Sequence, residues 1–405
     1  MKIFLGSVPF GCDNIGDEAI LEAVIRILRR NFDNPEICVS TAKPAQTARL
    51  FNCDAVGLIG FGKIDGNKHS VVSAIKNCDA YIWAGATGLS DYPDAAMVGL
   101  DFAQRFGKKT VVWNVGMDSE LNPAHFKLSG RKLALCKLLG HFLPRSFNPV
   151  EKTESLLRTK LGKRLSRALG KCDLVVLRDA QSAVALESLA RVGKITVGAD
   201  SACILRDFSD GNLRCLPNSA KEALLSPCEK IGVCISSQRP VSDLSGLSDA
   251  LDTLIDGGKR KVFFIPMNPA TDTVVMRKIA ASLVGRNDAF ILDTITERRS
   301  VMAVAAHCDA IVSSRLHLLI LSANAKTPII GISRGSKVGN FLSNFGLSPI
   351  GSVEVCDFRA LPDAVKNAIE TKAAFGETRA KAYKKFDESI GAAEQLLVDV
   401  LKERV

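Results

Sequence analysis

The sequence predicts an α/β protein built of two doubly wound, Rossmann-like domains that face a central cleft. Apolar strand-like runs alternate with segments that carry apolar residues at helical spacing, which is typical of parallel sheets covered by helices on both faces. The chain has 405 residues, too many for one compact core. The alternation stops at residues 207–229, which are rich in Gly, Pro, Asn and Ser, and then starts again.

The first half of the chain, residues 1–210, is expected to form the N-terminal domain. It opens with a strand over Lys2–Val8 and a helix over Gly16–Leu28, in which apolar residues recur every three or four positions. Short apolar runs predict the further strands of this half, at Ile37–Ser40, Ala80–Trp83, Thr110–Val115 and Leu174–Leu177. The helices expected between them include Ala95–Phe106 and Ala180–Ala190.

Residues 211–228 are expected to be a linker, and residues 229–375 a second domain with the same alternation. Its expected strands are Ile231–Ile235, Val262–Pro266, Phe290–Leu292, Ala310–Ser313 and Ile329–Ile332. Its expected helices are Asp243–Ile255, Asp272–Leu283, one that runs through Met302, and Leu316–Ala325. Residues 376–405, rich in Ala, Lys and Glu, predict a terminal helix, and packing of this helix back on the N-terminal domain is one expectation.

The net charge of +10 is unevenly spread along the chain. Twelve Lys and Arg residues lie between Lys127 and Cys172, and only Glu151 and Glu154 oppose them. This basic stretch is either a solvated helical surface or a region attracted to a polyanion, such as an acidic polymer, anionic lipid headgroups or a phosphate-linked acceptor. A nucleic-acid partner is not expected, because the stretch offers only two phenylalanines for stacking on bases.

Composition also indicates the compartment. The first residues read as a strand rather than a signal peptide, and no apolar run approaches about 18 residues, so we expect no transmembrane helix. The twelve cysteines form no C-x-x-C pair, and Cys38, Cys203 and Cys234 lie in apolar runs. We therefore expect buried thiols in a reducing cytoplasm, with neither a disulfide framework nor a metal site.

Ligands of doubly wound domains bind beyond the carboxyl ends of the strands, where helix N-termini direct amide groups outward. The first such turn holds Asn14, Gly16 and Asp17. Asn14 or Asp17 either caps the following helix or contributes to a site. Asp17 is a candidate base for a hydroxyl, although the helix N-terminus is expected to lower its pKa and weaken it in that role.

Two further turns of the first half carry candidate residues. In "YIWAGATGLSDYPDA", Gly85, Thr87 and Gly88 form either a plain tight turn or a loop that a phosphate or sugar approaches closely. In "CDLVVLRDAQSAVAL", Arg178 and Asp179 end a strand and Ser182 starts a helix. The Arg178–Asp179 pair either closes a local salt bridge or meets an anion. Asp200 ends another strand candidate.

The fourth turn is the richest in cations. In "CDAIVSSRLHLLILSANAKTPIIGIS", Arg315, Leu316 and His317 lie where a strand meets an apolar helix, and Arg334 and Lys337 follow the next strand. A guanidinium in apolar surroundings needs an anionic partner, because its desolvation is otherwise costly. Three cations and a histidine at one strand-end level predict a receptor for a compact, highly charged anion.

These motifs resemble the polysaccharide pyruvyl transferase family. The resemblance rests on "NIGDEAIL", "VVLRDAQS" with "GADSACIL", and "SSRLHLLILSANAKTPIIGIS", which together cover residues 10–340. The chain departs from the family pattern at "AGATG", where relatives carry a run of glycines, and at "SRGSK", where they carry a tyrosine and an acid before the lysine. The resemblance implies a glycosyltransferase-B-like fold, with the acceptor on the first domain and the donor on the second.

The resemblance also implies a reaction: the enolpyruvyl unit of phosphoenolpyruvate passes to a sugar diol, which gives a pyruvate ketal and phosphate. Its implied catalytic residues are His317 as acid and Asp17 as base. The implied donor-binding residues are Arg178, Arg315, Leu316, Arg334 and Lys337, and the implied acceptor or loop residues are Asn14, Gly16, Gly85, Thr87 and Gly88.

The expected partners are phosphoenolpyruvate, a sugar or lipid-linked oligosaccharide acceptor, and an anionic membrane surface, with no cofactor, metal or nucleic acid. Two other functions stay open. One is a nucleotide-sugar glycosyltransferase of the same fold, for which Glu297 is the candidate ribose ligand. The other is a non-catalytic relative that binds glycans.

Overall fold

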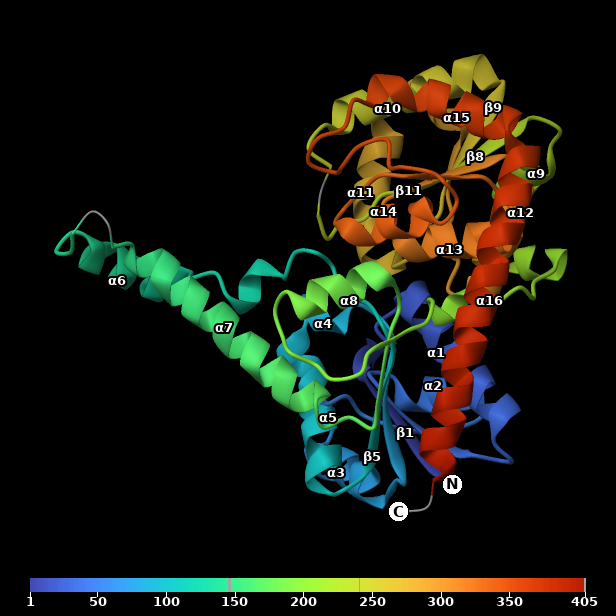
Figure 1. The fold of residues 1–405 in the computed structure, drawn as a ribbon. Coiled ribbons are helices and arrows are strands. Elements are labelled where there is room, and N and C mark those ends of the chain that lie inside the picture. The colour runs from blue at the N-terminus through green and yellow to red at the C-terminus, as the bar shows by residue number, and fades with distance from the viewer. Residues whose placement is uncertain (145–146, 240, 404–405) are drawn as a thin grey trace. The chain divides into compact units, whose positions relative to one another are not determined.

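The computed structural model describes residues 1–144, 147–239 and 241–403, and the chain divides into two compact units (Figure 1). Unit 1 consists of Met1–Pro9, Asn31–Gly198 and the C-terminal residues from Ala393, whereas unit 2 consists of Phe10–Arg30 and Ala199–Ala392. The predicted domains were continuous in sequence, and these units are not. Arg145 of the basic stretch and the last two residues of the predicted terminal helix, Arg404 and Val405, lie outside the described residues.

Unit 1 is built on a seven-stranded sheet with the order β3-β2-β1-β4-β5-β6-β7. Its strands are β1 (Lys2–Phe10), β2 (Glu36–Thr41), β3 (Asp54–Val56), β4 (Ala80–Ala84), β5 (Lys109–Val115), β6 (Leu174–Leu177) and β7 (Thr196–Val197). Its helices are α2 (Pro44–Phe51), α3 (Lys68–Asn77), α4 (Gly88–Asp91), α5 (Pro93–Arg105), α6 (Gly130–Gly140), α7 (Pro149–Leu169) and α8 (Ala180–Glu187). The strand order reverses between β1 and β4, and this topological switch point is where such sheets place ligands.

Unit 2 is built on a five-stranded sheet with the order β10-β9-β8-β11-β12 and a switch point between β8 and β11. Its strands are β8 (Glu229–Cys234), β9 (Arg260–Phe264), β10 (Ala289–Ile291), β11 (Ala310–Ser313) and β12 (Ile329–Gly331). Its helices are α9 (Asn218–Leu225), α10 (Leu244–Ile255), α11 (Pro269–Ser282), α12 (Arg298–His307), α13 (Leu316–Asn324), α14 (Ser336–Ser343) and α15 (Leu361–Glu370). Helix α1 (Ile15–Asn31) also lies mainly in unit 2, and the terminal helix α16 (Lys372–Lys402) contributes to both units.

The apolar runs of the sequence form the cores of both units. The interior strands are buried on both faces, as expected of parallel sheets covered by helices. Trp83, Trp113 and Tyr81 are the largest fully buried side chains. The strand pairings that flank both switch points are parallel, so two doubly wound α/β sheets are present and the predicted fold class is confirmed.

The predicted linker at residues 211–228 is wrong as a description of local structure. The segment contains most of a 3-10 turn (Asp210–Cys215) and the whole of helix α9. Ala220, Ala223 and Leu224 of α9 are buried. The apolar residues recur at helical spacing after Pro217, but the surrounding Gly, Asn and Ser masked that signal. Strand β3 was not predicted, because Asp54–Val56 shows no strand pattern of its own. The strand candidate that Asp200 was expected to end corresponds to β7, which ends three residues earlier, at Val197.

Candidate functional site

The start of α1 places Asp17 in a buried position of unit 2. Asn14 caps the helix, since its Oδ1 accepts the Gly16 amide at 3.2 Å, and its Nδ2 donates to Asp17 Oδ2 at 2.7 Å. Asp17 is 9% exposed. Of the two alternatives for this turn, Asn14 is therefore the cap, and the Asp17 carboxylate remains with the cluster described below.

Burial raises the pKa of Asp17 above its usual value, against the opposing effects of His317, the Asn14 hydrogen bond, Arg315 and Lys337. The predicted lowering by the helix N-terminus was wrong, because desolvation of a buried carboxylate outweighs the surrounding positive charge. A raised pKa makes an ionised carboxylate a stronger proton acceptor.

His317 lies against the same turn of α1. A Cβ atom added at Gly16 would be 2.4 Å from His317 Nδ1, so the imidazole occupies the space that a side chain at position 16 would need. On its other side, His317 Nε2 lies 3.5 Å from Asp200 Oδ2. Asp200 is 6% exposed, and its Oδ1 accepts the Ala202 amide at 3.0 Å. The imidazole therefore lies between the Gly16 backbone and the Asp200 carboxylate.

Arg315, at the end of β11, has a protein carboxylate as its partner. Its Nη2 and Nε donate to the two oxygens of Asp272 at 2.6 and 3.1 Å, in a bidentate pair. Asp272, on α11, is fully buried and also accepts the amides of Asn268 and Ser237. The sequence correctly required an anion beside Arg315, and Asp272 supplies it. Within the described part of the chain, the Nη1 group of Arg315 makes no hydrogen bond.

The loop after β12 contributes the remaining cations. Arg334 Nη1 donates to Ser236 Oγ at 3.0 Å and to the side-chain oxygen of Gln238. Lys337 lies in the first turn of α14 and is 7% exposed. Its charge acts on Asp17. Unit 2 therefore brings together eight of the predicted site residues at the ends of β11 and β12 and the start of α1. They are Asn14, Gly16, Asp17, Arg315, Leu316, His317, Arg334 and Lys337.

In unit 1, the loops after β4, β5 and β6 are tied together beyond the carboxyl ends of the strands. The Gly116 amide donates to Ala86 O at 2.7 Å, the Met117 amide to Ser182 Oγ at 2.9 Å, and the Asp118 amide to Ser90 Oγ at 3.0 Å. These three bonds connect the loop after β5 to the loops on either side of it, so the three loops form one edge beyond the carboxyl ends of β4, β5 and β6.

Arg178 lies on this edge and is 6% exposed. Its Nε donates to Asp179 Oδ2 at 3.1 Å, so the local salt bridge is present, and Asp179 Oδ1 also caps α8 at the Ser182 amide. A Cβ atom at Gly116 would be 2.5 Å from the Arg178 guanidinium carbon, so Arg178 packs directly over the glycine backbone. Arg178 belongs to unit 1, whereas Arg315 and His317 belong to unit 2.

The glycine turn after β4 also belongs to this edge. Gly85 and Ala86 adopt positive φ angles of 83° and 62°, and a Cβ atom at Gly88 would be 2.7 Å from the Trp83 ring. Thr87 begins α4, where its carbonyl accepts the amides of Ser90 and Asp91. The tight turn is therefore present. A side chain at position 88 would collide with the Trp83 ring, which explains why this residue is glycine.

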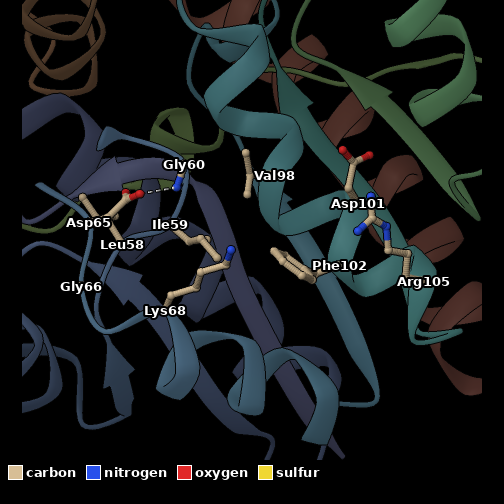
Figure 2. A pocket seen from close by; sticks show the side chains of 10 residues that line it. All are labelled: Leu58, Ile59, Gly60, Asp65, Gly66, Lys68, Val98, Asp101, Phe102 and Arg105. Carbon is tan, nitrogen blue, oxygen red and sulfur yellow. Dashed lines mark hydrogen bonds between the residues drawn. The ribbon is translucent and has the colours of Figure 1, made fainter. Parts of the chain in front are cut away.

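A separate cavity of about 330 Å³ lies in unit 1 between the segment after β3 and helix α5. Figure 2 shows Asp65 hydrogen-bonded to the Gly60 amide on one side, and Phe102 with Arg105 on the other. Lys68 and Arg105 lie 5.9 and 5.8 Å from the centre of the Phe102 ring. None of the predicted site residues lines this cavity.

Sequence reasoning missed the acidic and hydroxyl side chains that hold the cations. Asp272 was expected only as a helix start, and Ser236 and Gln238 were not singled out. The signal available for Ser236 was its position directly after β8, at the switch point. Gly116 likewise follows β5 directly, where a glycine often permits close approach of another group.

Solved structures share the fold of the whole chain. MnaA of S. aureus, solved with UDP, is 12% identical, with 99% of this chain and 96% of that chain covered and a TM-score of 0.62. HepE of Anabaena, solved with UDP-glucose, is 13% identical with full coverage of both chains and a TM-score of 0.60. The UDP-GlcNAc 2-epimerase of Neisseria meningitidis, bound to UDP-GlcNAc, is 11% identical with full coverage and a TM-score of 0.57.

No curated protein matches the sequence. The model of the family described as polysaccharide pyruvyl transferase matches residues 14–336, which is most of the chain and includes every predicted site residue except Lys337. The chain belongs to the polysaccharide pyruvyl transferase family.

Proposed function

We propose that the protein transfers the pyruvyl unit of phosphoenolpyruvate to two hydroxyls of a sugar, in a polysaccharide or its lipid-linked precursor, and releases phosphate. The observation that carries this proposal is the cluster in unit 2. A carboxyl group with a raised pKa, Asp17, lies beside an imidazole that approaches Asp200 to 3.5 Å and has cations nearby. Acid, base and anion-binding groups are thus present in one place.

The cations suit a donor with a carboxylate and a phosphate close together. Arg334 and Lys337 come from the loop after β12, and Arg315 offers Nη1 while Asp272 holds the rest of its guanidinium. The first amides of α13, beginning at Leu316, add donors that favour a phosphate. Arg178 of unit 1, which lies beyond the carboxyl end of β6, stays a predicted donor ligand.

In the proposed reaction, the His317 imidazolium gives a proton to the methylene carbon of the donor, which leaves an oxocarbenium-like centre at the neighbouring carbon. The first sugar hydroxyl adds to that carbon and its proton passes to Asp17. The bond to the phosphate oxygen then breaks, the second hydroxyl adds to the same carbon, and its proton leaves with the phosphate. One ketal and one phosphate result, transfer of the proton from Asp17 back to His317 restores both groups, and no oxidant or reductant is needed.

The test is phosphate release from phosphoenolpyruvate with a panel of sugar diols. We expect release with at least one diol, and a loss of roughly 100- to 10,000-fold in kcat for Asp17→Asn and for His317→Gln, as for other acid–base groups. Asp256→Asn, an exposed carboxylate of unit 2, is the matched control and should retain activity. Phosphate release unaffected by both site variants would contradict the assigned roles.

The same fold carries nucleotide-sugar enzymes, so the competing function is a nucleotide-sugar glycosyltransferase. Its candidate ribose ligand, Glu297, is exposed at the start of α12. Thermal-shift measurements separate the two functions, because a ligand at 100 times its Kd adds about 2.7 kcal/mol of stability. Stabilisation by UDP but not by phosphoenolpyruvate would favour the glycosyltransferase. A glycan-binding relative without activity would bind a diol sugar but release no phosphate.

The proposed donor is a cytoplasmic metabolite, so we place the reaction in the cytoplasm. An acceptor built on a lipid carrier would bring it to the inner face of a membrane.

A further inference from the structure

Helix α6 has no buried residue, although it is rich in leucine. Leu135, Leu138 and Leu139 are 57%, 56% and 48% exposed, and Phe142, just beyond the helix, is 80% exposed. These four residues follow the spacing i, i+3, i+4 and i+7, which places them on one face of the helix. A continuous apolar face of this kind in contact with water marks an interaction surface.

The opposite face of α6 has a partner inside unit 1. Helices α6 and α7 form a hairpin, and Figure 1 shows it extending away from the sheet of unit 1. Cys136 on α6 contacts Thr153 on α7, with 3.8 Å between Sγ and Oγ1. Because packing within the hairpin uses the face of Cys136, the face with the leucines is left outward.

The hairpin also carries the whole net charge of the protein. The basic stretch from Lys127 to Cys172 has twelve Lys and Arg residues against two acidic ones, a formal excess of ten that equals the net charge of +10 of the entire chain. The rest of the sequence therefore has no net formal charge. Arg131 and Lys132 are exposed in the first turn of α6, one helical turn from Leu135.

We propose that the α6 surface, defined as Arg131, Lys132, Leu135, Leu138, Leu139 and Phe142, docks on the surface of an anionic lipid bilayer. The leucines and the phenylalanine would enter the interface between headgroups and acyl chains, and the basic residues of the hairpin would bind the headgroups. In the described residues, no helix is both long and apolar enough to cross a membrane.

The charge of the hairpin favours an anionic bilayer over the other possible partners of this surface. A second copy of the chain would bring two strongly basic hairpins together, which electrostatic repulsion opposes. A nucleic acid would satisfy the charge but would leave the leucine face in water, because aliphatic side chains do not stack on bases. An anionic bilayer satisfies both the charge and the apolar face. This inference does not depend on the proposed reaction.

The experiment is flotation of the full-length protein with phosphatidylcholine vesicles, with and without phosphatidylglycerol. We expect binding to the vesicles that contain phosphatidylglycerol, weaker binding to neutral vesicles, and release at high salt. Leu138→Asp with Phe142→Asp should weaken binding at least about tenfold, since both lost apolar area and added charge oppose insertion. Both side chains are exposed, so the fold should be retained, which a thermal melt checks.

The matched control is Val284→Asp, which removes an apolar side chain that is 92% exposed in unit 2 and should leave flotation unchanged. A second readout is Phe142→Trp, whose fluorescence should shift to shorter wavelength with anionic vesicles, against the two native tryptophans, which are fully buried. Absence of flotation and of this shift would overturn the proposal. So would a dimer in sedimentation that the Leu138/Phe142 double variant dissociates, because a second copy would then cover the face.

Discussion

Gly16 sets the position of the imidazole at the centre of the proposed site. Because a Cβ atom there would lie 2.4 Å from His317 Nδ1, Gly16→Ala must displace the ring. We expect a cost of about 1–3 kcal/mol in stability, as for other overpacked positions, together with a large loss of kcat. Urea unfolding and steady-state kinetics measure the two effects.

Gly391→Ala is the control for this substitution, because a Cβ atom there meets nothing within 4 Å and the residue lies inside α16. It should stabilise the protein slightly, since alanine favours a helix more than glycine does. Normal kcat in Gly16→Ala would show that His317 has room to move without consequence.

Arg315 has a structural role as well as its proposed role in donor binding. Arg315→Ala leaves the fully buried Asp272 without its bidentate partner, and breaking such a pair costs about 3–5 kcal/mol. We therefore expect both a lower urea midpoint and a weaker response to phosphoenolpyruvate, roughly ten- to a hundred-fold in half-saturating concentration if one charge-assisted contact is lost. The double variant Arg315→Met with Asp272→Leu separates the effects. It should recover only part of the stability, because the Asn268 and Ser237 amides lose their acceptor, and it should not recover donor use.

Sequence alone predicted the cations of the site but not their partners. A guanidinium between a strand and an apolar helix implies an anion, and this logic holds for Arg315. The identity of that anion depends on tertiary structure, since Asp272 is 43 positions away in sequence. The raised pKa of Asp17 was hidden for the same reason: a helix start is visible in the sequence, whereas the burial that dominates its pKa is not.

At the scale of elements, α1 and α12 are joined by a charged network in unit 2. Arg298, whose side chain is 3% exposed, forms ion pairs with Glu22 on α1 and with Asp207. Arg26 and Arg299 bind the same two carboxylates. Burial opposes ionisation of Glu22 and Asp207, but the arginines outweigh it and lower both pKa values.

This network predicts sensitivity to acid. A lowered pKa in the folded state means that the ionised carboxylate stabilises the fold above the unfolded pKa, near 4.5 for Glu22 and 3.8 for Asp207. The stability is lost as the pH falls through the lower, folded values. Glu22→Gln should reduce stability at neutral pH by roughly 1–3 kcal/mol and flatten its acid dependence.

Thermal melts from neutral pH down to about pH 2 measure this dependence. Glu151→Gln, an exposed residue of α7, serves as the control and should follow the wild-type profile. An unchanged slope in Glu22→Gln would show that the network does not control acid stability.

Most elements were predicted from a visible apolar pattern, the three-residue strands β10 and β12 among them. Strand β6 and the start of α13 match their predicted bounds, because a full apolar run or helical period is visible in each. Strands β3 and β7 depend on pairing with a neighbour rather than on their own composition. Helix α9 was overlooked because turn-forming residues surround it.

On the scale of the whole molecule, α16 links the two units, since its residues up to Ala392 belong to unit 2 and those from Ala393 to unit 1. In unit 1, Lys109 Nζ donates to the carbonyls of Val400 and Glu403 at 2.5 and 2.6 Å. Leu397, also in this part, is 1% exposed. Leu397→Ala should therefore destabilise the protein by about 2–5 kcal/mol, as for other buried leucines.

Chemical denaturation measures this cost, and the exposed neighbour Gln395→Ala provides the reference, with an expected change within about 0.5 kcal/mol. A similar loss in both variants would show that burial of Leu397 does not account for the effect.

The interleaved course of the chain has a consequence for its synthesis. Helix α1 leaves the ribosome early, but its partners in unit 2 begin only at Ala199, after the whole of residues 31–198 has been translated. Domains generally fold as units during translation. The apolar side of α1 therefore stays without its unit 2 partners while residues 31–198 are synthesised. A chaperone that shields this one segment would protect the polypeptide at its most vulnerable stage.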